Sequence, residues 1–206
     1  MAANCKSFLR FLWYYPVLIL ALVVFYSFGV GMTDEPVILA IASCSMLLFV
    51  SMTCFLTTIT NQFQMTIQFS STRKAAFGGL LAVQLLWSVG MPALVLLVLW
   101  LLRGEQAVTP FWTVAPVFVP LVMAATGGGG LLGFATMLLR KAGRVISYVI
   151  FFATLLACFA LLMPAMVFAV DQGFVPPAWV PVVICGAAAA CFAGEGIVAS
   201  RYCVKG

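Results

Sequence analysis

The chain has 206 residues, of which 65% are hydrophobic and 7% are charged, and its formal net charge at pH 7 is +5. A soluble domain of this length needs far more polar surface, so the composition excludes a water-soluble globular protein and predicts an all-α polytopic membrane protein, with one transmembrane domain over residues 1–206. The basic residues form no run with interleaved aromatics outside the apolar stretches, so we expect no nucleic-acid partner.

The residue types needed for common active sites are scarce. The chain has no His and only five Asp and Glu in total, so no set of zinc or transition-metal ligands is expected. No G-x-x-x-x-G-K-[ST] motif occurs, and the chain therefore cannot cradle ATP phosphates in a P-loop. None of the seven Cys falls in a predicted external turn, which argues against disulfides. We predict no catalytic, cofactor-binding or metal-binding residue, and no enzyme activity in this chain by itself.

The N-terminal stretch over 4–15 combines apolar residues, cationic residues and an aromatic cluster. Such a composition is typical of a helix lying at the membrane surface, with Arg10, Trp13 and Tyr14 as interfacial anchors. A plain aromatic anchor without a separate helix is the alternative. The apolar run that follows is long and no convincing small-x-small cleavage site precedes Asp34, so we interpret the start as a retained signal anchor.

Six segments are long and apolar enough to cross a bilayer core, which requires about 20 residues in a helix. Short external turns that contain proline are expected between alternate helices, at 33–36, 103–110 and 171–177. Proline also opens the possibility that 163–181 re-enters the outer leaflet, with an ordinary helix pair as the equal alternative. The predicted helices cover residues 15–32, 37–59, 76–102, 112–139, 146–170 and 178–200.

The basic residues alternate between the ends of these helices. Nine of the ten lie at one membrane face and only Arg103 lies at the other. Because juxtamembrane Lys and Arg remain on the cytoplasmic side, the pattern predicts that both termini are cytoplasmic. The nine are Lys6, Arg10, Arg73, Lys74, Arg140, Lys141, Arg144, Arg201 and Lys205.

The longest polar segment, at 60–74, falls on the predicted cytoplasmic side. It intersperses apolar residues with uncharged Gln, Asn and Thr, which favours a short amphipathic docking helix over a solvated connector, although both fit the composition. Ser70, Ser71 and Thr72 are candidate caps for a helix that starts at Arg73 and Lys74. The candidate docking residues are Asn61, Phe63, Gln64, Ile67, Gln68, Phe69, Arg73 and Lys74.

Three small residues of the fourth predicted helix, Ala125, Gly129 and Gly133, are spaced four apart on one face. Small residues at this spacing allow two helix backbones to approach closely in lipid, and a flexible hinge is the alternative. Two strongly polar residues, Gln84 and Glu195, lie inside predicted helices. Interhelical hydrogen bonding is the simplest role for Gln84. Glu195 is a functional candidate because burying a carboxylate is costly, and snorkelling or pairing with Arg201 is the alternative.

Two local stretches, FSSTRKAAFG at 69–78 and GFATMLLRKAGR at 133–144, resemble the permease subunit of ABC-2-type (type V) ATP-driven exporters, in particular small Firmicutes exporters of the phenol-soluble-modulin and antimicrobial-peptide type. The stretch 69–78, FSSTRKAAFG, is similar to a G-x-[ST]-R-K-x-x-[FY]-x-G pattern, with Ser70 in place of the first Gly. The stretch 133–144, GFATMLLRKAGR, is similar to the end of the fourth helix in these proteins, with Ala142 in place of an aromatic. The motifs cover about a tenth of the chain, whereas the six-helix topology covers all of it.

The resemblance implies a half-transporter in the bacterial plasma membrane. Two copies of this chain, or one copy and a close relative, would pair with two ABC-type ATPase subunits that bind ATP and magnesium. A cytoplasmic coupling helix at 61–74 and the interfacial N-terminal helix would contact the ATPase. The sparse charge inside the membrane favours an amphipathic or hydrophobic peptide as the exported substrate, and lipid or drug export fits equally well.

A non-transporting six-helix protein, such as an assembly or immunity factor, remains the alternative, because it needs no ATPase and no charged pathway. An intramembrane enzyme is the weakest hypothesis, since no paired carboxylates, Ser–Lys pair or metal ligands are visible in the apolar stretches. An ABC ATPase encoded next to this chain would distinguish the exporter from the other two classes.

Overall fold

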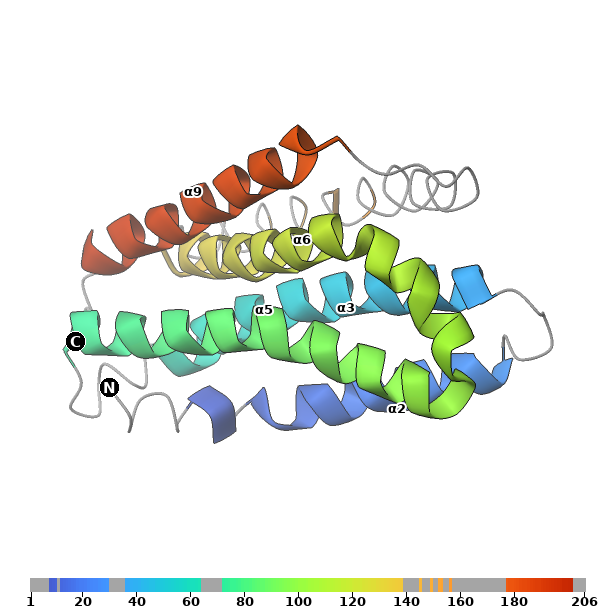
Figure 1. The fold of residues 1–206 in the computed structure, drawn as a ribbon. Coiled ribbons are helices and arrows are strands. Elements are labelled where there is room, and N and C mark those ends of the chain that lie inside the picture. Colours follow the sequence, from blue (N-terminus) through green and yellow to red (C-terminus); the bar gives the residue numbers. More distant parts are fainter. Residues whose placement is uncertain are drawn as a thin grey trace.

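The computed structural model describes residues 8–10, 12–29, 36–63, 72–138, 177–201 and a few positions between 145 and 156. Every regular element within these residues is a helix (Figure 1). In chain order the elements are α2 (Tyr14–Gly29), α3 (Pro36–Thr58), the π-helix η2 (Ile59–Phe63), α5 (Arg73–Arg103), α6 (Glu105–Leu138) and α9 (Trp179–Arg201).

The described helices include five that are long and apolar enough to cross a membrane. The predicted all-helical character is therefore confirmed for the described residues, and five of these helices have the length and apolar composition of membrane spans. The fifth predicted helix, 146–170, falls almost entirely outside the described residues. Within it and just before it, Val145, Val149, Phe152 and Leu156 are helical and exposed. The five candidate spans are Phe8–Phe25, Ala42–Phe63, Lys74–Leu102, Ala115–Leu138 and Trp179–Ser200.

Capping residues define both ends of α5. Thr72 is the N-cap, and its Oγ1 accepts a hydrogen bond from the backbone N–H of Ala75 at 3.3 Å, which identifies it among the three candidate caps; α5 begins at Arg73, three residues before the predicted range 76–102. At the other end, Gly104 adopts φ 70° and its N–H donates to the carbonyl of Trp100 at 2.8 Å. Glycine suits this position because other residues are strained at positive φ.

The expected external turn over 103–110 is wrong, because α6 begins at Glu105, directly after Gly104. Helix α6 is 34 residues long, which corresponds to about 51 Å and exceeds the bilayer core. Its first half contains Pro110, Pro116 and Pro120, and Figure 1 shows α6 bending in this part before it runs alongside the other helices. Proline removes a helical hydrogen bond and clashes with the preceding turn, so these residues account for the bend.

Helix α6 lies between α3 and α9, and α5 packs beside it, while α2 packs on α3 and α5 (Figure 1). Polar and aromatic contacts join the helices on the α3 side. Trp87 Nε1 donates to Ser51 Oγ at 2.9 Å, and the Trp87 ring meets Phe55 edge-on at 5.8 Å. Tyr15 Oη and Thr57 Oγ1 share a hydrogen bond of 2.9 Å between α2 and α3.

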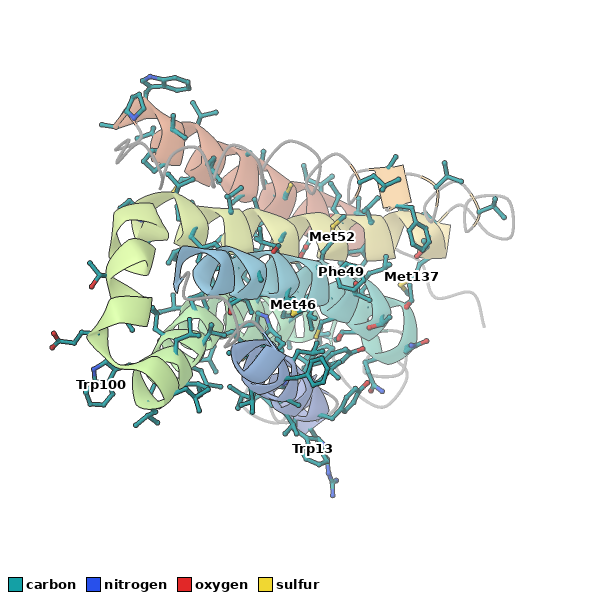
Figure 2. All side chains as sticks on the ribbon, turned by 90° about the vertical axis from the view of Figure 1, so that its right-hand side faces the viewer. Trp13, Met46, Phe49, Met52, Trp100 and Met137 are labelled. Carbon is teal, nitrogen blue, oxygen red and sulfur yellow. The ribbon has the colours of Figure 1, made fainter. Side chains whose placement is uncertain are left out.

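The outer surface of α5 and α9 is apolar, as expected for helices that face lipid. Trp13 and Trp100 point away from the bundle (Figure 2) and are 65% and 52% exposed. Tryptophan at helix ends is typical of the membrane–water interface. The exposed large apolar residues of these two helices are Leu85, Leu86, Val89, Leu97, Trp100, Leu101 and Leu102 on α5, and Trp179, Val182, Val183 and Ile197 on α9.

Candidate functional site

The two polar residues singled out in the sequence meet in the structure. Gln84 of α5 donates from Nε2 to Oε1 of Glu195 on α9 at 3.0 Å, although 111 residues separate them in the chain. The same Nε2 lies 3.4 Å from the carbonyl oxygen of Thr126 on α6. Both side chains are 0% exposed. One amide group therefore joins three helices in the interior of the bundle.

Two hydroxyl groups extend this arrangement. Ser88 Oγ donates to the carbonyl of Gln84 at 2.7 Å and lies 3.1 Å from Thr126 Oγ1. Thr126 Oγ1 in turn donates to the carbonyl of Met123 at 2.8 Å. Each hydroxyl has one proton, so two protons serve these three contacts: each group donates either to the backbone of its own helix or to the other hydroxyl. We refer to Gln84, Ser88, Thr126 and Glu195 as the polar cluster; all four are 0% exposed.

Two oxygen atoms of the polar cluster lack a hydrogen-bond partner among the described residues: Gln84 Oε1 and Glu195 Oε2. Among the side chains that the structure describes, which leave out that of Arg201, the Glu195 carboxyl has no cationic partner, and its other oxygen accepts from Gln84. Buried polar atoms are bonded in the great majority of cases, so a pair of unbonded oxygens flanking one hydrogen bond calls for an explanation.

A glycine of α6 makes room for this pair. A Cβ at Gly130 would overlap the carboxyl group of Glu195 and would lie 2.8 Å from Gln84 Nε2. The two side chains therefore lie directly on the α6 backbone, and any larger residue at 130 would displace them.

The predicted small-residue stripe packs against α3 of the same chain. A Cβ at Gly129 would overlap the carbonyl group of Met52, and one at Gly133 would lie 2.9 Å from Ile59 Cβ and 3.1 Å from the carbonyl oxygen of Leu56. Ala125 packs against Met52 and Leu56. We call this contact of Ala125, Gly129 and Gly133 with α3 the glycine seam.

The glycine seam continues into an aromatic contact at the end of α3. Phe63, the last residue of η2, meets Phe134 of α6 edge-on, with ring centroids 4.7 Å apart and planes at 83°. Both rings are 0% exposed. The burial of Phe63 corrects its expected role as an exposed docking residue: its ring is taken up by the interior of the bundle, because η2 keeps the chain on α6 for one more turn.

The other predicted docking and anchor residues are distributed as follows. Asn61 and Lys74 are exposed, and Arg73 begins α5. Arg10, Trp13 and Tyr14 are exposed near the start of the bundle, and the Tyr14 ring stacks on Tyr15 with centroids 4.4 Å apart. Gln64, Ile67, Gln68 and Phe69, and so most of the expected coupling helix, lie outside the described residues, as does most of 163–181.

Sequence reasoning treated Gln84 and Glu195 separately and did not include Ser88, Thr126 or Gly130. The spacing of these residues gives a partial indication of the cluster. Ser88 lies four residues after Gln84, and Gly130 lies four residues after Thr126, so the members of each pair share a helix face. The pairing of these faces across three helices depends on packing, which spacing along the chain does not encode.

The chemistry open to the polar cluster is limited. It contains one ionisable group, and no group of three or more His, Cys, Asp or Glu that could hold a metal ion occurs in the searched, described residues. The cluster can share hydrogen bonds and hold a proton. Comparison of the chain with protein-family models, curated proteins and solved structures found no match.

Proposed function

We propose that the chain is the membrane permease subunit of an ATP-driven exporter of the ABC-2 type. Two copies, or one copy and a close relative, form the membrane part, and a separate ABC-type ATPase docks on its cytoplasmic side. The nine-to-one distribution of basic residues and the two local sequence resemblances support this proposal.

The main observation behind the exporter proposal is that both ends of the segment 61–74 connect to helices of the bundle. Helix α3 runs without a break into η2, where Phe63 contacts Phe134 and Ile59 faces Gly133 on α6. A force that the ATPase applied to 61–74 from the cytoplasmic side would therefore act on α3 and α6 together. Thr72, at the other end of the segment, caps α5, so the same force would also reach a third helix.

In the proposed mechanism, closure of the ATPase dimer on ATP moves 61–74 as a lever. Packed interfaces switch between discrete arrangements rather than deform continuously, so the movement would shift α3 and α6 as rigid bodies.

The sparse charge of the apolar helices favours an apolar or amphipathic substrate. The exposed side chains of α5 and α9 are largely aliphatic and aromatic, and the residues of the polar cluster are 0% exposed. We therefore propose export of amphipathic peptides, or of lipid or drug molecules, from a bacterial cell, with both termini of the chain in the cytoplasm.

The test is affinity purification of the tagged full-length chain from native membranes, with identification of its stoichiometric partner. We expect an ABC-type ATPase with the wild type. Substituting Gln64, Gln68 and Phe69 together by Ala should abolish the copurification, because loss of a central aromatic anchor alone costs about 2 kcal/mol, or about thirtyfold in affinity.

Substituting Gln106 and Gln172 by Ala, on the opposite predicted side, is the matched control and should leave the complex intact. A wild-type chain that purifies with no ATPase would overturn the exporter proposal and favour the assembly or immunity factor. A triple variant that keeps full ATPase binding and coupled transport would overturn the docking role of 61–74.

A further inference from the structure

We infer that the polar cluster is a binding site for one proton, held on Oε2 of Glu195 and shared with Oε1 of Gln84. This inference does not rest on the proposed function, because it follows from hydrogen-bond accounting inside the bundle. A side-chain amide and a carboxylic acid can form a closed pair with two hydrogen bonds, in which each group donates once and accepts once.

One half of such a pair is present. Gln84 Nε2 donates to Glu195 Oε1 at 3.0 Å. The second half requires the acid hydroxyl to donate to the amide oxygen, and those two atoms are the ones left without a partner among the described residues. A carboxylate cannot form this bond, since both oxygens of an ionised carboxyl are acceptors only. A proton on Glu195 Oε2 that is directed at Gln84 Oε1 would give both orphan atoms a partner.

The described surroundings of Glu195 contain no cation. Glu195 is 0% exposed, Gln84 of α5 donates to its carboxyl, the backbone of Gly130 on α6 lies against it, and Cys191 precedes it by one turn on α9. None of these is a cation, and an isolated buried carboxylate is strongly disfavoured. Binding needs no co-reactant: the carboxylate takes up a solvent proton to form the O–H bond and releases it by the reverse step.

A metal cation is a poorer occupant. Hard cations take several oxygen ligands that converge at about 2.0–2.6 Å. Here the hydroxyl groups of Ser88 and Thr126 bond to backbone carbonyls of their own helices, and the pair lies directly on the α6 backbone at Gly130. A proton needs no additional space.

The proton would hold α9 in place. The Gln84–Glu195 contact is the side-chain hydrogen bond between α5 and α9 that the described residues show. Loss of the proton would remove one bond of the closed pair and create an unpaired buried charge, so the inference predicts that α9 loosens when Glu195 ionises.

The test uses the full-length chain in lipid nanodiscs and infrared difference spectroscopy between wild type and Glu195→Gln at neutral pH. We expect a carbonyl stretch of a protonated carboxylic acid in the wild type that is absent from the variant and shifts in D₂O. Glu105→Gln, which removes an exposed carboxyl at the start of α6, is the matched control and should keep the band.

Thermal unfolding against pH gives a second readout. If the folded chain holds a proton that the unfolded chain releases above about pH 4.3, wild-type stability must fall as pH rises. Glu195→Gln can form the same closed pair with an amide donor, so it should fold and lose this pH dependence, whereas Glu105→Gln should retain it.

A wild-type spectrum without the band at neutral pH would overturn the inference, and so would a pH dependence identical in wild type and Glu195→Gln. Stabilisation by sodium chloride but not by choline chloride, with the band absent, would assign the site to a metal cation instead. If Glu195→Gln does not fold, the infrared spectra of the wild type at neutral and alkaline pH are compared instead. The inference then requires that the carbonyl band of the protonated acid disappears at alkaline pH.

Discussion

The two faces of α6 pack differently against α3 and α9, although closely spaced glycines lie on both faces. On the α3 face, the glycine seam places Gly129 against the backbone carbonyl of Met52 and Gly133 against Leu56 and Ile59. On the α9 face, Gly127 and Gly130 face side chains, those of Cys191, Phe192 and Glu195. The contact at Gly129 is backbone on backbone, whereas Gly133 also meets the Ile59 side chain, and the contacts on the α9 face are backbone on side chain only.

This difference predicts different mechanical behaviour. A contact between two helix backbones has no side-chain rotamer through which to relax, so α3 and α6 should move as one unit. The α9 contact includes flexible side chains and a polar pair whose hydrogen bonding depends on protonation in the proposed scheme. We therefore expect α9 to be the helix that moves relative to α6, with α3 following α6.

The largest expected effect comes from Phe134→Ala, which removes the aromatic contact at the end of the glycine seam. Truncation of a fully buried Phe costs about 3–5 kcal/mol of unfolding free energy. Thermal unfolding can be followed with a thiol-reactive dye in a background that keeps only Cys44 and Cys54, because these two free thiols are buried, whereas the exposed Cys185 would react in the folded chain.

Leu138→Ala is the control for this substitution, since Leu138 lies one turn further along α6 and is 47% exposed. It should change stability by much less. If both variants unfolded at the same temperature, the contact between Phe63 and Phe134 would not hold the seam together. A double-mutant cycle of Phe63→Ala and Phe134→Ala should give a coupling of about 0.5–1.5 kcal/mol.

The sequence predicted the helical, membrane-embedded fold well because apolar runs of bilayer length determine it almost alone. Thr72 was found by its position before a basic helix start. The turn at 103–110 was mispredicted because Pro110 was taken as a helix breaker, whereas α6 continues through it with a bend. The small-residue stripe was visible from spacing, but its partner on α3 was not.

The polar cluster was also predicted only in part, because the sequence did not show which residues would meet. Gln84 and Glu195 were each recognisable as costly to bury, yet their pairing joins α5 and α9 across 111 residues. Phe63 gave the opposite error: its position among Gln and Thr residues suggested an exposed face, and the extra turn of η2 buries it instead. Both features depend on which helix faces meet, which one sequence does not specify.

A smaller effect is expected from Gly129→Ala, which tests the rigid face directly. The added Cβ would overlap the Met52 carbonyl, so α3 and α6 must separate, and overpacking of this kind costs about 1–3 kcal/mol. Gly128→Ala is the matched control, because a Cβ there meets nothing within 4 Å. The measurement is again thermal unfolding. Equal melting temperatures for these two neighbouring variants would show that the seam is not tightly packed.

The smallest effect is expected from Gly127→Ala, on the α9 face. The added Cβ would lie 3.0 Å from Cys191 Cβ, which moves only with the α9 backbone, and 3.3 Å from Phe192 Cε1, an atom of a rotatable ring, so α9 has to shift by only a few tenths of an ångström. The Phe192 ring is only partly buried and can rotate away, and alanine is a better helix former than glycine by about 1 kcal/mol, so the two terms should nearly cancel. We expect a change in unfolding free energy below about 1 kcal/mol, together with faster labelling of Cys191 by a thiol reagent as α9 shifts. Should Gly127→Ala instead destabilise the chain as much as Gly129→Ala, without a change in Cys191 labelling, α9 would be held as rigidly as α3, and the proposed difference between the two faces of α6 would be wrong.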